Sequence, residues 1–257
     1  MLHKLRRILD YLRSCRRDLR PVINAQSSTE LLAVTQKFWW SGNSATGFNG
    51  QILRARIVYE LYKTCQCTAF VETGTYLGST AMAASQLTGG MVLSCELFLK
   101  YHLLARLRLL FFPNVRLTRA DSRTFLKKVC SSNLVGELPL FYLDAHWYED
   151  IPLQMELDLI QMRYKQYVIV VDDFKVPGRK FSFDKYSNSE LSGECYPVLF
   201  NGSAEYRVFY PNYEPSEDTG SDRGYVIIVC GCDQAMEVAM KSFPLNLLIP
   251  HDPKNRE

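Results

Sequence analysis

Acidic residues follow two strand-like runs in the middle of the chain. Asp144 closes the apolar run in FYLDAHWYED, and Asp172 and Asp173 close the run VIVVDDF. If these runs are neighbouring parallel strands, about 4.8 Å apart, their ends bring the three carboxylates together. Clustered carboxylates repel one another unless a cation neutralises them, and oxygen ligands suit Mg²⁺, Ca²⁺ or Mn²⁺. The sequence therefore predicts a divalent metal site, with Mg²⁺ as the expected ion; the alternative is a turn cap at Asp172 and Asp173 beside an isolated Asp144.

A histidine follows the first of these acids. His146 stands two residues after Asp144, and Trp147 and Tyr148 come next. Beside a metal, His146 is a candidate general base, whereas a solitary histidine is more often structural. The two aromatic residues would either form a wall for a substrate or belong to the core. Asp144 and His146 are thus the predicted catalytic residues.

A glycine-containing turn follows the first apolar run, FVETGTYLGST. Glycine lets the backbone approach a ligand closely and adopt a positive φ angle. The stretch lacks the G-x-G-x-x-G spacing of dinucleotide-binding folds and the G-K-[ST] of a phosphate-binding loop. A phosphate cradle is therefore disfavoured, and a ligand with a small cationic or amino-acid end is favoured; the alternative is a tight strand-to-helix turn without a ligand.

Acids also end the next two strand-like runs. Glu96 ends MVLSCEL, and Asp121 and Ser122 follow VRLTRA. An acid at the end of the second strand commonly accepts hydrogen bonds from ribose hydroxyls. Three successive strands that each end in an acid form a stronger pattern than any one of them.

The elements that must position these residues alternate regularly from residue 69. Strand-like runs at 69–72, 91–97, 115–120, 138–145 and 167–174 alternate with helical patterns, and two further strands are expected at 206–211 and 224–231. Such alternation indicates right-handed crossovers. We expect an α/β, Rossmann-like, doubly wound sheet of seven mostly parallel strands. An antiparallel C-terminal edge hairpin and an N-terminal helical extension would complete it.

The combination VETGTYLGST, CEL and ADS resembles the cofactor site of class I S-adenosylmethionine-dependent methyltransferases. Over about residues 47–174 the chain is most similar to the metal-dependent O-methyltransferases, which include the catechol, macrocin-type sugar and cephalosporin-hydroxylase-like groups. The 28-residue interval from Asp144 to Asp172 resembles the spacing of the ligands in the catechol-type metal site. The pair Asp172-Asp173 on the fifth strand resembles the acidic pair of the sugar enzymes. The segment FNGQILRARI is similar to the one that covers the cofactor in this group.

The resemblance implies a site around S-adenosyl-L-methionine. Its methionine part would contact residues of the glycine-containing turn, namely Glu72, Gly74, Tyr76, Gly78 and Thr80. Glu96 would hold the ribose, and Asp121 and Ser122 would face the adenine. The resemblance also implies residues 1–60 as a helical extension and cofactor lid, and 61–257 as the methyltransferase domain.

The implied reaction is methyl transfer to a hydroxyl of a small molecule or sugar, assisted by the metal, with His146 removing the proton. The catechol enzymes have a lysine at the base position and none lies here, whereas the sugar-type enzymes place an acid or histidine nearby. The alternative function is a non-catalytic S-adenosylmethionine-binding module that acts through its basic N-terminal arm. A nicotinamide-dependent oxidoreductase is disfavoured because the glycine fingerprint is absent.

Positive charge is concentrated at the N-terminus. Residues 1–20 carry a net charge of +5 while the 257-residue chain carries +3, so the remainder sums to −2. Leu2, Leu5, Ile8, Leu9 and Leu12 form one face of an amphipathic helix. This helix would contact an anionic membrane surface, its own domain, or a second subunit in a homo-oligomer. Since the body is nearly neutral, no nucleic acid partner is expected.

Composition is that of an ordinary globular protein, with 47% hydrophobic and 22% charged residues. No secretory signal and no spanning segment are recognised, so we expect a cytoplasmic protein. Two C-x-C pairs, Cys65/Cys67 and Cys230/Cys232, would then be buried inert thiols, with a zinc site as the alternative.

Overall fold

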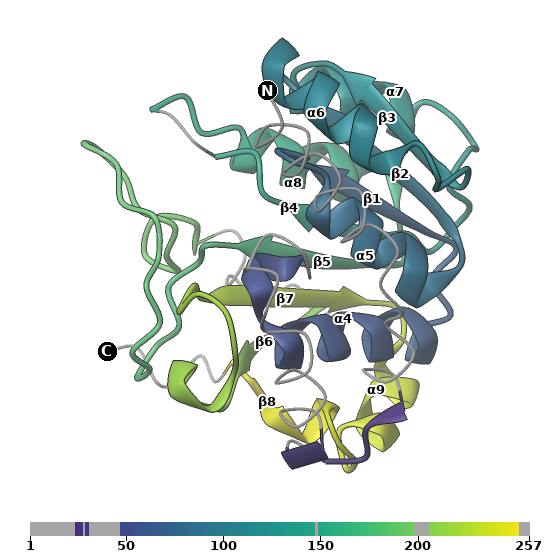
Figure 1. Ribbon diagram of the computed structural model, residues 1–257. Coiled ribbons are helices and arrows are strands. Elements are labelled where there is room, and N and C mark those ends of the chain that lie inside the picture. Colours follow the sequence, from purple (N-terminus) through teal and green to yellow (C-terminus); the bar gives the residue numbers. More distant parts are fainter. Residues whose placement is uncertain (1–23, 28, 31–46, 147–148, 198–205, 252–257) are drawn as a thin grey trace, which may run out of the picture.

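The computed structural model describes residues 24–27, 29–30, 47–146, 149–197 and 206–251. The predicted helix of residues 1–20, the aromatic pair 147–148 and the tail 252–257 lie outside the described residues (Figure 1). From residue 47 onward the elements are η3 (Phe48–Gly50), α4 (Ile52–Thr64), β1 (Ala69–Thr73), α5 (Ser79–Thr88), β2 (Met91–Glu96), α6 (Leu99–Leu109), β3 (Val115–Arg119), α7 (Ser122–Cys130), β4 (Leu140–Leu143), α8 (Leu153–Arg163), β5 (Tyr167–Asp172), β6 (Tyr206–Pro211), η5 (Pro215–Glu217), β7 (Tyr225–Cys230), α9 (Asp233–Ala239), η6 (Leu245–Leu247) and β8 (Leu248–Pro250).

One sheet organises these elements. Its strand order is β3-β2-β1-β4-β5-β7-β6-β8, which Figure 1 shows from the top of the view to the bottom. The first five strands pair in parallel, and the β5–β7, β7–β6 and β6–β8 pairs are antiparallel. Strand β1 has β2 on one side and β4 on the other, so the chain reverses its direction of travel across the sheet there. Open α/β sheets bind ligands beyond the carboxyl ends of strands at such a switch point.

The predicted mostly parallel sheet with an antiparallel C-terminal hairpin is confirmed, but the count of seven strands is wrong. An eighth strand, β8, pairs with β6 through Tyr210↔Ile249 and its neighbours. The predicted hairpin consequently lies inside the sheet and β8 forms the edge. A strand of three residues that ends in proline is too short to show an alternation of apolar and polar residues in the sequence. Only its pairing with the distant β6 identifies it as a strand.

Helices cover the sheet in two groups. Helices α4, α5 and α6 contact one another in sequence, and α7 contacts α8. The apolar, β-branched strands β5 and β7 are buried along their whole length, as strands covered on both faces require. Helix α4 crosses the predicted domain boundary at residues 60 and 61, and Leu53, Ile57 and Leu61 belong to the core of the sheet domain. Among the described helices, none is both long and apolar enough to cross a membrane.

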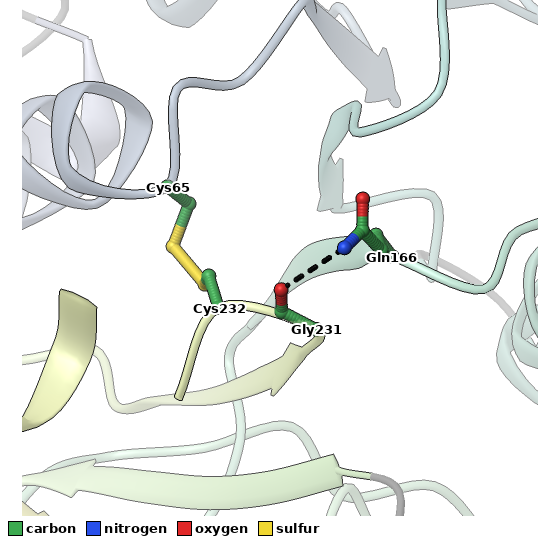
Figure 2. Close-up of a disulfide and its surroundings, with 4 residues drawn as sticks. All are labelled: Cys65, Gln166, Gly231 and Cys232. Atoms are coloured by element: carbon green, nitrogen blue, oxygen red, sulfur yellow. Dashed lines mark hydrogen bonds between the residues drawn. A yellow bond between two sulfur atoms is a disulfide. The ribbon is translucent and has the colours of Figure 1, made fainter. Parts of the chain in front are cut away.

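A disulfide joins two distant parts of the chain. Cys65 ends α4, Cys232 precedes α9, and the bond between them spans a sequence separation of 167 residues with Cα atoms 5.6 Å apart (Figure 2). Next to it Gln166 donates a hydrogen bond of 3.2 Å to the carbonyl of Gly231. The prediction of inert thiols is therefore wrong for Cys65 and Cys232, because only the tertiary fold brings them together. Cys67 and Cys230 are buried, and no cysteine belongs to a candidate metal-binding group among the described residues.

Candidate active site

Two adjoining cavities open at the carboxyl ends of the parallel strands. The first, of about 230 Å³, lies between the β1–α5 turn, the ends of β2 and β3 and the start of α7, and the second is about 600 Å³. Both are lined by Gly74, Tyr76 and Asp144. Of the other predicted site residues, Glu96, Asp121 and Ser122 line the first cavity and Thr80 and Asp173 line the second. Glu72, Gly78, His146 and Asp172 line neither.

The wall shared by the two cavities depends on Gly74. Its φ angle is +84°, and a β-carbon placed on it would lie well inside van der Waals contact with the carbonyl oxygen of Asp144. The turns after β1 and β4 therefore meet backbone to backbone, which only glycine allows. Gly78 also has a positive φ of +79°, but it precedes α5 and faces Ala105 of α6. The structure thus gives Gly74 a place at the site and Gly78 a place in helix packing.

The carboxylate of Glu96 is fixed at the first cavity by the backbone. Its two oxygens accept hydrogen bonds of 2.8 Å from the backbone N–H groups of Tyr76 and Phe98. Burial raises the pKa of Glu96, while these N–H groups act in the opposite direction. Since each oxygen has a second lone pair, the carboxylate remains able to accept hydrogen bonds from a ligand.

Aromatic rings form one wall of this cavity. The rings of Tyr76 and Tyr101 lie 4.7 Å apart at 54°, and both line the cavity. Tyr76 has a φ angle of +49°, which is uncommon for a residue other than glycine. Tyr101 comes from α6, where the sequence shows only a helical pattern, and was not predicted as a site residue.

Another part of the cavity lining is polar. Asp121 caps α7 by accepting a hydrogen bond of 2.9 Å from the backbone N–H of Arg123. The Arg123 side chain forms ion pairs of 2.8 Å with Asp121 and Asp150, and it holds the pKa of both carboxyls below their usual values. Ser122 is buried beside them. Arg123 and Asp150 line the cavity and were missed, because Asp150 follows an irregular segment without a motif.

Glu72 lies beneath the turn instead of facing a cavity. It is buried, and it accepts a hydrogen bond from Ser94, whose hydroxyl lies 2.5 Å from that of Thr75. Burial, helped by the nearby charge of Glu96, raises the pKa of Glu72 to about 8. A protonated Glu72 therefore supports the turn from below at neutral pH.

A possible metal-binding group lies in the second cavity and at its wall. Asp144, His146 and Asp173 each place a ligand atom within 4.8 Å of the others. Burial and the negative charges of Asp172 and Asp173 raise the pKa of Asp144, and burial and Asp172 raise that of Asp173 to about 7. Asp173 also has a φ angle of +55°, an unfavourable conformation for a side-chain-bearing residue that concentrates at functional sites. Carboxylates that repel each other in this way fit a divalent cation.

Asp172 was predicted as a metal ligand, but the structure places it in a different set of contacts. It forms an ion pair with Arg54 and accepts hydrogen bonds from Tyr142 at 2.7 Å, Asn49 at 3.0 Å and the backbone N–H of Asp173 at 2.7 Å. Burial by itself would raise the pKa of Asp172, but Arg54 and the other donors hold it below its usual value. Asp172 ends β5 and meets Arg54 of α4, whereas Asp173 follows the strand with a positive φ angle and lines the second cavity. Arg54 is itself buried, with its guanidinium 4.5 Å from the ring of Tyr225.

An arginine from a distant loop also reaches the acidic group. Arg223 donates to Asp173 at 2.5 Å and forms a second ion pair with Asp184, and all three line the second cavity. The carboxylate of Asp144 thus shares the cavity with Arg223 and its two ion-paired acids, Asp173 and Asp184. Neither Arg223 nor Asp184 was predicted, because both lie in irregular segments without a recognisable pattern.

His146 is completely buried. Its Nε2 atom is 4.0 Å from a carboxylate oxygen of Asp144, and neither ring nitrogen has a hydrogen-bond partner among the described residues. Burial lowers its pKa, so the ring is neutral at neutral pH with a nitrogen lone pair available. The hydroxyl of Tyr186 donates to the backbone carbonyl of His146 and holds this segment in place.

No family model matches the chain, and no curated protein matches its sequence. Solved structures do share its fold. An O-methyltransferase from Bacillus cereus in complex with SAH (S-adenosylhomocysteine) aligns with 82% of this chain and 94% of its own, at 14% identity and a TM-score of 0.53. A putative caffeoyl-CoA O-methyltransferase from Staphylococcus aureus aligns over 70% and 83%, at 15% identity and a TM-score of 0.51. The O-methyltransferase TomG from Streptomyces achromogenes, in complex with S-adenosylmethionine, aligns over 83% and 94%, at 16% identity and a TM-score of 0.50.

At these identities the likeness concerns the fold. The chain has the Rossmann-like fold found in these O-methyltransferases, as the resemblance of its motifs predicted. Its cavities lie at the switch point between β1 and its two neighbours, where such folds bind their ligands.

Proposed function

We propose that the protein transfers a methyl group from S-adenosyl-L-methionine to a hydroxyl of a small molecule or sugar, with a divalent cation, expected to be Mg²⁺, assisting. One observation carries the proposal: a cavity with a fixed acceptor carboxylate, Glu96, adjoins a cavity with a cation-binding group, and Gly74 forms the wall between them. A two-part ligand with a ribose at one end and a reactive centre at the other suits this arrangement.

The first cavity fits the adenosine part. Glu96 would accept hydrogen bonds from the ribose hydroxyls, because both of its oxygens keep free lone pairs beside two fixed backbone donors. Tyr76 and Tyr101 would pack against the adenosine. Asp121 and Ser122, which line the same cavity, would face the base.

The second cavity fits the methionine part and the acceptor. Thr80 and Gly74 line it close to the turn after β1, and Glu72 supports that turn from below. S-adenosylmethionine would supply the methyl group, and a divalent cation would lower the pKa of the acceptor hydroxyl. Asp144 and Asp173 would hold the cation, since their carboxylates repel each other without one.

His146 has two possible roles at this centre. As a third ligand it needs only to reach the cation, and its position within 4.8 Å of both carboxylates satisfies this. As a general base, its predicted role, it must reach the acceptor, and its complete burial outside the cavity lining argues against that. The ligand role is therefore the one that the geometry favours.

Calorimetry with S-adenosylhomocysteine tests the cofactor site directly. The full chain should bind this product with micromolar affinity, and Glu96→Ala should weaken binding by about tenfold or more, because charged hydrogen bonds contribute about 1.5–3 kcal/mol each. Glu137→Ala changes an exposed acid away from the cavities and is the matched control. Absence of binding by the folded chain would refute the proposal.

The alternative function is a binding module without turnover. It would use the first cavity as well, but it would not need the cation-binding group. Methyl transfer to a panel of phenols and sugars, measured with and without EDTA, separates the two. Tight binding of the product without turnover of any acceptor would favour the module.

A further inference from the structure

The outward face of α6 is apolar although it faces solvent. Leu99, Leu103, Leu107 and Leu110 follow one another at steps of four, four and three residues, so they lie in one stripe along the helix and its C-terminal end. Leu97, two residues before the helix, is exposed as well. These five leucines, which we call the α6 surface, are 49, 50, 53, 66 and 51% exposed, respectively. Contiguous exposed apolar residues commonly mark a site of interaction.

The α6 surface is separate from the face of α6 that packs into the core. The opposite side of the helix is the buried one, with His102, Ala105 and Leu109 packed inward. Ala105 and Leu109 lie next to Gly78 at the start of α5, which fixes the rotation of α6 about its axis. The leucines therefore have no place in the core that the described residues form, and this exposed face is a candidate interaction surface.

The charge around the α6 surface identifies its partner. Lys100 and Arg106 flank the stripe on α6, and Arg119 is exposed on the neighbouring edge strand β3, close enough to His102 of α6 to act on its pKa. No acidic residue occurs between Glu96 and Asp121. Apolar side chains flanked by basic ones are typical of helices that lie in the interface of a membrane with anionic lipids.

We propose that the α6 surface docks the protein on an anionic lipid bilayer. Two copies joined by this face would bring Lys100, Arg106 and Arg119 of one copy against the same three basic side chains of the other, which like-charge repulsion disfavours. Residues 1–20 carry a net charge of +5 and would be repelled in the same way. A bilayer with anionic headgroups satisfies both the leucines and the basic residues.

Docking would bring the mouth of the first cavity to the membrane. Leu97 belongs to the α6 surface and also lines this cavity beside Tyr76 and Tyr101. Helix α6 and β3 lie at the end of the sheet that is uppermost in Figure 1. The protein would thus hold its ligand site at the lipid–water boundary.

Vesicle co-sedimentation of the full chain tests this proposal. Vesicles of phosphatidylcholine and phosphatidylserine at 3:1 should bind at least tenfold more protein than pure phosphatidylcholine, and 0.5 M salt should remove most of the difference. Leu103→Gln with Leu107→Gln should lower binding at least tenfold. Met162→Gln with Val238→Gln replaces two apolar residues on α8 and α9 that are more exposed than these leucines, and this variant should bind like the wild type.

A second variant makes the test independent of the leucines. Lys100→Glu with Arg106→Glu should abolish the preference for phosphatidylserine, and circular dichroism and thermal unfolding would show that each variant is folded. Equal binding to both vesicle types, or equal binding by wild type and the Leu103/Leu107 variant, would overturn the proposal. A dimer in sedimentation equilibrium that only the Leu103/Leu107 variant breaks, without vesicle binding, would instead assign the surface to a second copy of the chain.

Discussion

The carbonyl oxygen of Asp144 occupies the space that a β-carbon on Gly74 would need. This approach joins the turns after β1 and β4, and it places against each other two residues that line both cavities. The site therefore depends on the absence of a side chain at residue 74 as much as on the carboxylates around it.

Gly74→Ala should damage both stability and cofactor binding. The new β-carbon must displace the Asp144 backbone, whereas Gly89→Ala, at a similarly positive φ of +64°, meets no atom within 4 Å. We expect the control to cost about 1 kcal/mol of unfolding free energy and Gly74→Ala about 3 kcal/mol or more. Urea unfolding and S-adenosylhomocysteine calorimetry measure the two effects. Equal losses in both variants would mean that the two turns separate without consequence.

The roles at the acidic group can be separated by Mn²⁺ binding. Asp144→Asn and Asp173→Asn should each lower Mn²⁺ affinity about tenfold or more, because a neutral ligand replaces a charged one. Asp158→Asn, at an exposed acid on α8, should leave it unchanged. His146→Ala should lower Mn²⁺ affinity as well if His146 is a ligand. If it is a base, affinity stays and turnover falls by about 10²–10⁴.

Glu72 should make the protein less stable as pH rises. Its pKa in the folded protein, about 8, exceeds the ordinary value of 4.5, so the folded state binds the proton more tightly than the unfolded state. The stability that this group contributes is complete below about pH 4.5 and is lost as the pH rises toward 8, at up to about 1.4 kcal/mol per pH unit. Glu72→Gln, which imitates the protonated form, should remove this loss. Parallel pH dependence of wild type and variant in urea unfolding would contradict the assignment.

The Cys65–Cys232 disulfide should be detectable and stabilising. Alkylation of the denatured chain without reductant should leave these two cysteines unmodified, and reduction should make all eight reactive. Reduction, or Cys65→Ser with Cys232→Ser, should cost about 2–4 kcal/mol of unfolding free energy, because the bond closes a long loop of the unfolded chain. Cys195→Ser, at an exposed free thiol, serves as the control.

Complete alkylation of all eight cysteines before reduction would show that the bond does not form. Disulfides persist mainly in oxidising compartments, so the bond weighs against the cytoplasmic localisation predicted from the sequence. That localisation stays a prediction, as do the contacts of residues 1–20.

The sequence by itself determined the elements and the edge of the sheet at which chemistry takes place. Alternating strand and helix patterns from Ala69 to Asp172 predict the five parallel strands, because local periodicity records which faces are buried. Glu96, Asp121 and Asp144 end or follow their strands, and parallel topology brings such residues to one edge. The position of Gly74 after β1 marks the close approach.

Only the tertiary structure decided which partner each side chain meets. Asp172 and Asp173 are adjacent in sequence, yet Arg54 of α4 neutralises one and Arg223 of a distant loop contacts the other. Cys65 and Cys232, β6 and β8, and the outward leucines of α6 depend in the same way on neighbours far away in the chain. Periodicity records the burial of an element, but neutralisation, cross-linking and exposure depend on three-dimensional proximity, which no local pattern contains.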